Sequence, residues 1–356
     1  MTEELRLFYS VHLSVAMTTA QTDETQTSYG STRAPSSPRG ADFIFQCTVV
    51  IIGIAGAASN ALILYAMIAS KPHKKQLLIF NQNVFDLCSC LFLVITYVLK
   101  LCNLYLTGTL GYWLCMLLLS ENLRWCSLNG GVINLLSLTI ERYLKVVHRA
   151  RSKKFLRKWV VYSAIAFAWI GAIIYNMSIV FSTSTVIDGV CYGYVNWKSR
   201  VAAIVVGIWH FVTFFLIVVF GLVFCYWRIL VVIRRQAKVM AGHSTAGSTI
   251  TTATQTKSNP AQLNVTKTML LVCLFFVVSY VPDAVYYLLV NLGVNLPLSG
   301  SVYYFATAMV FLYICTNPFV YAVKFDPVRR VLQQLISRKN SSVQSAENDN
   351  TTAGRS

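Results

Sequence analysis

Ionisable residues stand inside long apolar stretches of this sequence, and they are the first residues that indicate chemistry. Each interrupts a run that is otherwise almost free of charge. Charged groups in such surroundings are energetically unfavourable, and they usually mark a ligand site, an ion path or a switch. The residues are Asp86, Glu121, Arg124, Glu141, Arg142 and Asp283.

Patterns typical of enzymes and metal sites are missing from the sequence. It has no G-x-S-x-G, no HExxH and no phosphate-binding glycine loop. Its ten cysteines lack metal-ligand spacing, and the nearest pair, Cys88 and Cys90, lies in an apolar run where free Cys acts as a small hydrophobe. We therefore expect neither an enzyme nor a metal centre.

The elements that carry these residues are apolar runs long enough to cross a membrane. The chain is 56% hydrophobic and 12% charged, whereas soluble domains have about 25% charged residues. About 20 mostly apolar residues span the hydrocarbon core, and a lipid-exposed backbone there must be helical. We expect an all-α membrane protein with a seven-transmembrane helix bundle. The runs are residues 43–69, 77–99, 110–140, 159–187, 201–227, 268–290 and 302–323.

Basic residues indicate how these helices are oriented. Most of the 30 Lys and Arg lie in the connections after the first, third and fifth runs and in the C-terminal segment. Because cytoplasmic loops are enriched in Lys and Arg, we expect an extracellular N-terminus, a cytoplasmic C-terminus and a multi-pass protein of the plasma membrane. The net charge of +17 is then a topology signal, and we expect no nucleic acid partner.

Four domains follow from composition. Residues 1–41 are rich in Ser and Thr and predict a disordered extracellular tail, whose acidic start differs from the basic start of a secretory signal. Residues 42–325 form the membrane domain. Residues 326–338 have apolar residues at helical spacing beside arginines, which favours an amphipathic helix on the membrane surface over a solvated one. Residues 339–356 predict a disordered cytoplasmic tail.

Polar and proline residues placed on successive runs make the sequence resemble the rhodopsin-like (class A) G-protein-coupled receptors over about residues 43–338. Each residue is a weak signal alone, but their order is highly specific. They are Asn60 in the first run; Asn81 and Asp86 in the second; Glu141, Arg142 and Tyr143 at the end of the third; Trp169 in the fourth; Tyr226 in the fifth; Phe276 and Pro282 in the sixth; and Asn317, Pro318 and Tyr321 of an N-P-x-x-Y motif in the seventh.

The resemblance implies an activation switch. Arg142 would pair with Glu141 at rest and on activation meet Tyr226 or a G protein; alternatively, it snorkels to lipid headgroups. Pro282 would kink its helix for switching or for packing alone. Tyr280 stands two residues before Pro282 in place of the family's Trp, and Val218 replaces a proline in the fifth run. In the family this Trp acts as an aromatic switch and the proline accompanies a bulge in the fifth helix. The departures argue against both features here, but not against the overall fold.

The resemblance also implies a polar core and a disulfide. Asp86 would lie among Asn60 and Asn317, where one alternative is a bound sodium ion. The other is a protonated or hydrogen-bonded Asp86, because Gly131 stands where the family has a hydroxyl partner. Cys115 and Cys191 match the family's disulfide, which an oxidising exterior permits. Cys102 is a competing partner.

The ligand is constrained mainly by what the sequence lacks. Phe311 stands where retinal-binding members have lysine, so we expect no retinal, and Arg124 stands where amine receptors have aspartate. Arg124 either binds an acidic group of the ligand or pairs with Glu121 or Asp283. We expect a peptide. The candidate ligand pocket comprises Glu121, Arg124, Trp125, Asp283, Tyr286, Tyr287 and Phe305.

The expected function is to transmit binding of an extracellular ligand to heterotrimeric G proteins. Membrane lipid is a further partner. A set of C-terminal hydroxyl residues either recruits receptor kinases and arrestin or is simply polar: Ser337, Ser341, Ser342, Ser345, Thr351 and Thr352. The alternative function is a transporter with a midplane site. The two halves show no repeat, which such transporters often have.

Overall fold

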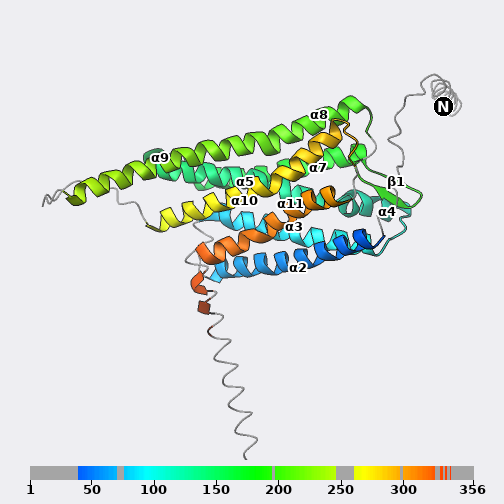
Figure 1. Ribbon diagram of the computed structural model, residues 1–356, viewed down its shortest axis with the longest axis horizontal. Coiled ribbons are helices and arrows are strands. Elements are labelled where there is room, and N and C mark those ends of the chain that lie inside the picture. Colours follow the sequence, from blue (N-terminus) through cyan, green and yellow to red (C-terminus); the bar gives the residue numbers. More distant parts are fainter. Residues whose placement is uncertain are drawn as a thin grey trace, which may run out of the picture. The chain divides into compact units, whose positions relative to one another are not determined.

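The computed structural model describes residues 39–69, 76–194, 197–245, 260–296 and 300–324, with six positions between 329 and 337 (Figure 1). The proposed tails and most of the amphipathic segment 326–338 lie outside these residues, so their assignments stay predictions. The first helix begins at Arg39, three residues before the expected start of the membrane domain at residue 42. Apolar side chains already begin at Phe43 and support helix formation across this boundary.

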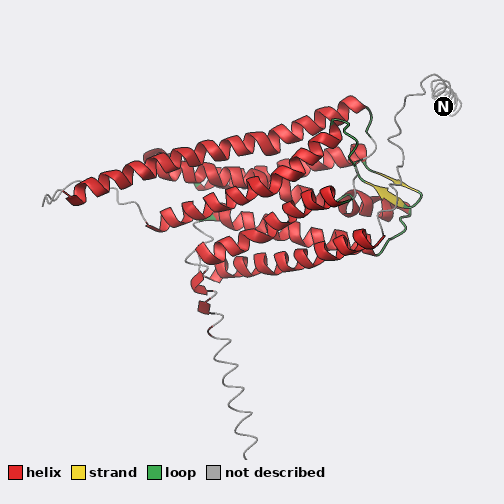
Figure 2. Cartoon of the chain, in the orientation of Figure 1, coloured by secondary structure: helices red, strands yellow, loops and turns green. Residues whose placement is uncertain are grey.

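The described chain is almost entirely helical, with one short hairpin (Figure 2). The elements are α2 (Arg39–Ala69), α3 (Leu77–Leu101), α4 (Gly108–Leu114), the π-helical η3 (Cys115–Leu119), α5 (Asn122–Val147), α6 (Arg149–Phe155), α7 (Lys158–Thr183), β1 (Thr185–Ile187), β2 (Val190–Tyr192), α8 (Arg200–His210), the π-helical η4 (Phe211–Leu216), α9 (Ile217–Thr245), α10 (Pro260–Asn291) and α11 (Ser301–Lys324).

Six helical segments are long and apolar enough to cross a membrane, and α5 is the seventh helix of the bundle. The six segments are Gly40–Ala69, Leu77–Leu101, Lys158–Thr183, Arg200–Arg235, Thr266–Asn291 and Ser301–Val320. With 26 residues, α5 has sufficient length, but it carries many buried polar side chains. It packs against α3, α7 and α9, so its side chains meet protein more than lipid. The predicted seven-helix fold is confirmed.

The third helix departs most from its predicted range. Residues 110–140 were expected to be continuous, but the helical path breaks after η3 and resumes at Asn122. Glu121 adopts a left-handed conformation (φ 61°, ψ 17°), which is uncommon for a residue with a side chain. The turn keeps its hydrogen bonds, since the N–H of Ser120 donates to the Cys115 carbonyl and that of Glu121 to the Leu118 carbonyl. Hydrophobicity alone does not reveal such a turn.

Three other boundaries also differ from expectation. Helix α5 continues to Val147, so Glu141 and Arg142 lie within it, more than a turn before its end. The fourth run ends as helix at Thr183, because residues 185–187 form β1. The fifth run extends as helix to Thr245. In each case the apolar run marked the membrane segment but not the point where the helix stops.

A disulfide joins the β-hairpin to the start of the third helical region. Strands β1 and β2 are antiparallel, with Val186 opposite Cys191. Asp188 and Gly189 form the turn, both with positive φ (49° and 75°), as expected for a two-residue Asp-Gly hairpin. Cys191 is bonded to Cys115, which confirms that pairing, and the competitor Cys102 is a free, exposed thiol.

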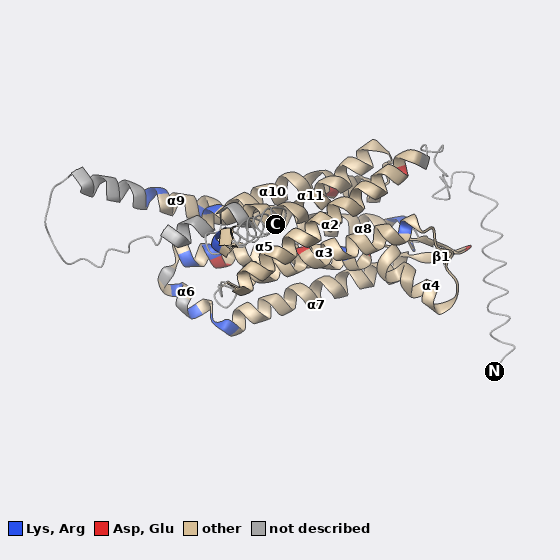
Figure 3. Ribbon diagram, turned by 90° about the horizontal axis from the view of Figure 1, so that it is seen from below, with Lys and Arg blue, Asp and Glu red and all other residues tan. Residues whose placement is uncertain are grey.

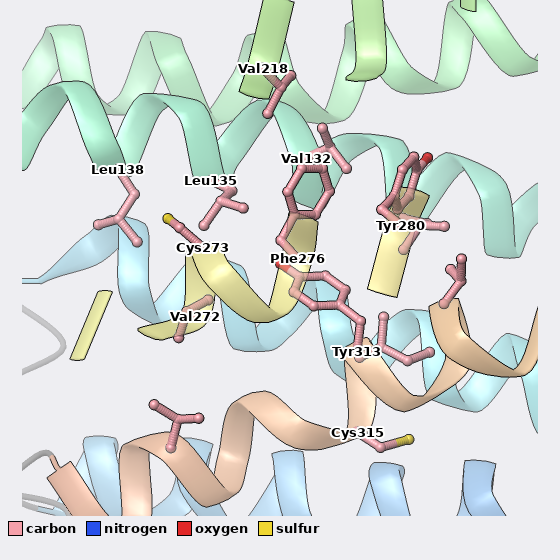
Figure 4. Packing of buried hydrophobic residues seen from close by; sticks show 14 of the residues in the cluster. Val132, Leu135, Leu138, Val218, Val272, Cys273, Phe276, Tyr280, Tyr313 and Cys315 are labelled. Carbon is pink, nitrogen blue, oxygen red and sulfur yellow. The ribbon is translucent and has the colours of Figure 1, made fainter. Parts of the chain in front are cut away.

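The core between α5, α9, α10 and α11 is built from large apolar side chains (Figure 4). Phe276 lies at its centre, with its ring centroid 5.0 Å from Tyr280 and 5.5 Å from Tyr313. Apolar side chains also cover the outside: Phe220 is 75% exposed and Val278 is 63% exposed. Such a surface is unfavourable in water and suits a protein surrounded by lipid.

The two ends of the bundle differ in charge. Lys and Arg gather where α6 and the distal part of α9 lie, as Figure 3 shows for the described residues. We call this the Arg142 end, because Arg142 is near that end of α5. The opposite end carries the disulfide and the strands, and we call it the hairpin end.

Candidate functional site

A buried cluster of charges lies at the hairpin end. The carboxylate of Glu121 pairs with both Lys100 of α3 and Arg124 of α5, and Arg124 Nε donates to Glu121 Oε2 over 2.9 Å. Arg124 is 3% exposed and Glu121 is 8% exposed. Of the alternatives for Arg124, the structure shows the internal pair with Glu121. Lys100 was not among the expected site residues, because it lies just outside its apolar run.

Aromatic rings complete the surroundings of Arg124. Its guanidinium carbon lies 4.2 Å from the centroid of Trp125 and 5.0 Å from that of Phe311 on α11. Both distances suit a cation–π contact. Arg124 therefore joins α5 to α11 through stacking and to the turn before α5 through its ion pair. Phe311 stands where retinal-binding members have lysine, and here its ring packs against the Arg124 guanidinium.

The structure brings together only part of the expected ligand pocket. Asp283 lies near enough to Arg124 and Glu121 to interact with their charges. Tyr286 is buried, with its ring 5.9 Å from Tyr303. Phe305 is 59% exposed and lies on the outer surface of α11, away from the cluster. Phe305 was included because it is aromatic, like the other candidates. Its position around the helix turns it toward the outside, and the residue type does not show this.

At the Arg142 end, Glu141 holds two cations. A carboxylate oxygen of Glu141 lies 3.3 Å from Arg142, and its other oxygen pairs with Lys145 one turn further along α5. Arg142 and Glu141 are both buried. The expected resting pair is therefore present, but Lys145 shares the carboxylate. The i, i+4 spacing of Glu141 and Lys145 is the sequence signal for this additional contact.

The other residues expected around Arg142 occupy different positions. Tyr226 is buried on α9 and lies near Arg142, Thr139 and Cys273. Tyr143 turns toward His148, with its hydroxyl 3.1 Å from Nε2. Pro318 lies inside α11, whereas the side chain of Tyr321 is outside the described residues. Tyr226 and Arg142 therefore lie in the same buried part of the bundle.

A chain of polar side chains crosses the middle of the bundle. Trp169 Nε1 donates to Asn81 Oδ1, and Asn81 Nδ2 donates to Asn134 Oδ1 over 3.0 Å. Asn134 Nδ2 donates to Gln82 Oε1, and Gln82 Nε2 in turn reaches Asp86 Oδ1 over 3.3 Å. Buried polar groups require such partners. This hydrogen-bonded network connects α7, α3 and α5. Gln82 and Asn134 were not among the residues predicted from the sequence.

Asp86 connects this network to the last helix. Asn317 Nδ2 of α11 donates to Asp86 Oδ2 over 2.8 Å. Asn60 was expected beside Asp86, but its Nδ2 donates instead to the Ile314 carbonyl over 3.1 Å and ties α2 to α11. Both asparagines therefore fix α11, through different partners.

Both carboxylate oxygens of Asp86 accept hydrogen bonds from side-chain amides. Amide N–H groups of Gln82 and Asn317 point at its two carboxylate oxygens, whereas a cation requires oxygen donors there. A Cβ on Gly131 would lie 3.2 Å from Gln82 Nε2, so the Gln82 amide occupies the space beside this glycine. The structure supports the alternative of a hydrogen-bonded Asp86.

Tyr280 replaces the expected tryptophan and has a partner of its own. It is fully buried, and its hydroxyl donates to Asn129 Oδ1 of α5 over 3.4 Å. Asn129 Nδ2 donates to Asn176 Oδ1 of α7 over 3.2 Å. Pro282 follows within the same helix, α10. The aromatic position before the proline is thus tethered to two other helices.

The fifth helical segment contains a bulge despite having no proline there. The π-helical η4 covers Phe211–Leu216 and ends two residues before Val218. Just before it, His210 stacks on Phe214 with centroids 5.1 Å apart, and its Nδ1 lies 3.1 Å from the Tyr175 hydroxyl. A π-helical turn requires an extra residue in the turn but no proline. The absence of proline therefore did not predict the absence of the bulge. Such turns are frequent at functional sites.

Seven helices, a polar network through their centre and a buried Glu-Arg pair at one end define a membrane receptor of the seven-helix class. The sequence profile described as "7 transmembrane receptor (rhodopsin family)" matches residues 59–321. The chain therefore belongs to the rhodopsin family of G-protein-coupled receptors. This membership decides against the transporter alternative.

Similar proteins lie within the same family. The chain is 25% identical to rat somatostatin receptor type 5 over 320 residues, which cover 85% of the chain and 80% of that receptor. It is 23% identical to mouse galanin receptor type 1 over 308 residues, 81% of each. It is 22% identical to mouse somatostatin receptor type 3 over 345 residues, 90% of the chain and 75% of the relative.

Proposed function

We propose that this receptor is activated by an extracellular peptide. The observation that carries the proposal is the extensive similarity to somatostatin and galanin receptors, which recognise peptides, over at least 75% of their lengths. The charged and aromatic cluster at the hairpin end supports it, because a peptide offers both charged and apolar groups. Its chemistry gives no support to retinal, which requires a lysine that is absent from position 311.

In this proposal the hairpin end is extracellular and the Arg142 end cytoplasmic, in the plasma membrane. A disulfide is favoured in an oxidising compartment, and it lies at the hairpin end. The basic side chains gathered at the other end (Figure 3) match the enrichment of Lys and Arg in cytoplasmic loops.

Helices α5 and α10 provide the route between the two ends. Helix α5 carries Arg124 near one end and Arg142 near the other, and Tyr280 joins α10 to α5 between them. A peptide that binds one arrangement of α10 more tightly shifts the population toward it. The kink at Pro282 then turns a small displacement at the hairpin end into a larger one at the Arg142 end.

At the Arg142 end, the change would release Arg142 from Glu141. Arg142 would then be free to contact Tyr226 or a heterotrimeric G protein. Receptor kinases and arrestin would act later on Ser and Thr between Ser337 and Thr352, and lipid would cover the exposed apolar surface of the bundle. These partners are part of the proposal.

Nucleotide exchange on G proteins tests this function. Membranes from cells that express the receptor would be exposed to peptide mixtures, lipid extracts and small organic acids, and binding of a non-hydrolysable GTP analogue would be measured. We expect a response to peptides that is absent from control membranes and lost with Arg142→Ala at equal surface expression. A response to lipids or acids alone would contradict a peptide ligand, whereas a peptide response retained by Arg142→Ala would contradict the switch.

A further inference from the structure

Asp283 is a carboxylate that faces the interior of the bundle. It lies on α10 three residues after Tyr280 and four before Tyr287, so the helical repeat places all three on one side. Val281 and Val285, on either side of this stripe, are 36% and 38% exposed toward the outside. Asp283 interacts with the charges of Arg124 on α5 and of Glu121 just before α5, which agrees with this inward position.

The nearby cations are already engaged by another acid. Lys100 and Arg124 both pair with Glu121, and Arg124 is further held between Trp125 and Phe311. Asp283 makes neither a hydrogen bond nor an ion pair with the part of the chain that the structure describes, and it is partly accessible. An unpaired carboxylate within a membrane bundle is unfavourable, so this position suits an incoming cation.

Tyrosines share this region of the bundle with Asp283. Tyr280 and Tyr287 lie on the same side of α10 as Asp283, and Tyr303 of α11 packs against Tyr286 of α10 with ring centroids 5.9 Å apart. The face of a tyrosine ring attracts ammonium and guanidinium groups, whereas it gives no such attraction to a carboxylate. The rings and Asp283 thus favour the same charge. Arg124, for which binding an acidic group was one of two alternatives, has its guanidinium directed to Glu121.

We propose that Asp283 is the residue that binds a basic side chain of the peptide, an arginine guanidinium or a lysine ammonium. The inference rests on the proposed function and specifies the chemistry of its ligand. Glu121 has a different task in this site, because it neutralises the receptor's own cations and is fully used by them. Specificity for a basic residue then comes from helix α10, whose movement activates the receptor.

The test uses hexapeptide mixtures that are acetylated at the N-terminus and amidated at the C-terminus. In each mixture one position is fixed as Arg, Lys, Glu or Leu, and the other positions exclude charged residues, so the fixed side chain supplies the only charge. G-protein nucleotide exchange is measured on membranes with the wild-type receptor, Asp283→Asn, Asp283→Glu and Asp188→Asn. The last variant is a matched control, because it removes the same charge from the exposed hairpin turn, where asparagine tolerates positive φ.

We expect Arg- or Lys-fixed mixtures to activate the wild-type receptor more potently than Glu- or Leu-fixed ones. Asp283→Asn should weaken that response about 10- to 100-fold, as expected for loss of one partner of a buried charge pair. Asp283→Glu should retain most of it, and Asp188→Asn should match the wild type. Wild-type surface expression of Asp283→Asn excludes misfolding as the cause.

Two failures are distinguishable. If Glu- or Leu-fixed mixtures activate as well as basic ones, or Asp283→Asn leaves the basic response unchanged, the role of Asp283 is wrong while peptide activation stands. If no mixture activates the wild-type receptor, peptide activation fails, and the assignment of Asp283 fails with it. An equal loss in Asp188→Asn would show general attraction by negative charge at the hairpin end and would also overturn a direct contact.

Discussion

Arg124 Nε donates to Glu121 Oε2 over 2.9 Å, so of the two alternatives for Arg124 the internal ion pair is present and its charge is neutralised within the receptor. Glu121 reaches it from a left-handed turn between η3 and α5. The same carboxylate pairs with Lys100 of α3. One acidic side chain therefore fixes the junction of two helices and a turn, and its main contribution is to the stability of the hairpin end.

Glu121→Gln should strongly destabilise the receptor. The change leaves Lys100 and Arg124 without their shared partner, and an unpaired buried charge costs about 3–5 kcal/mol. The melting temperature of the purified, detergent-solubilised protein measures the effect. Glu121→Gln combined with Arg124→Met should recover part of the loss, because removing both partners leaves fewer unpaired charges. A melting temperature unchanged by Glu121→Gln would show that the pair does not stabilise this fold.

Tyr280→Phe should raise signalling in the absence of ligand. The hydroxyl of Tyr280 joins α10 to Asn129 of α5, and a hydrogen bond contributes about 0.5–1.5 kcal/mol. Loss of this tether makes movement of α10 easier and should raise basal nucleotide exchange about 2- to 10-fold. Tyr65→Phe, at a 55% exposed position on α2, is the matched control. Basal exchange equal in the two variants would mean that the tether does not hold the resting state.

Removing the disulfide should loosen the hairpin end. Cys191→Ser breaks the bond to Cys115 across a separation of 76 residues, and a native disulfide typically contributes about 2–4 kcal/mol. We expect a lower melting temperature and a weaker peptide response. Cys102→Ser changes a thiol that is free and exposed, so it should leave both properties intact. Equal losses in the two variants would indicate that Cys102 also forms a required bond.

Sodium should have little effect on the ligand-free receptor. Gln82 and Asn317 direct N–H groups at Asp86, so replacing sodium by potassium at constant ionic strength should not alter the melting temperature. Asp86→Asn should lower it in both salts, because the new amide keeps only one acceptor oxygen and turns an N–H group toward one of the two donors, Gln82 or Asn317. Stabilisation by sodium that disappears in Asp86→Asn would show an ion at this position.

The sequence predicted the seven helices well because membrane spanning requires long apolar runs. It also predicted the Glu141–Arg142 pair and the Cys115–Cys191 bond, since each follows from a motif that this family shares. It did not predict the turn at Glu121, because an apolar run shows no sign of a single left-handed residue.

Contacts between helices were harder to predict than the helices. Gln82 and Asn134 are joined only when α3 and α5 pack, and nothing in their separate runs indicates this pairing. Phe305 and Tyr303 are both aromatic and two residues apart, yet only Tyr303 takes part in the cluster. The rotation of each helix decides such cases, and rotation depends on the packing of the whole bundle.

The claim that the Arg142 end controls a G protein is tested most directly without any ligand. Receptors reconstituted in lipid nanodiscs would be mixed with purified heterotrimeric G proteins, and basal nucleotide exchange measured. Glu141→Gln weakens the partner of Arg142, so basal exchange should rise several-fold. Lys145→Gln removes the other cation from Glu141 and keeps the Glu141–Arg142 pair, so it should not raise exchange.

The decisive variant combines Glu141→Gln with Arg142→Ala. If released Arg142 is what engages the G protein, basal exchange in this double variant should fall to the level of empty nanodiscs. Exchange that stays as high as in Glu141→Gln alone would contradict the account.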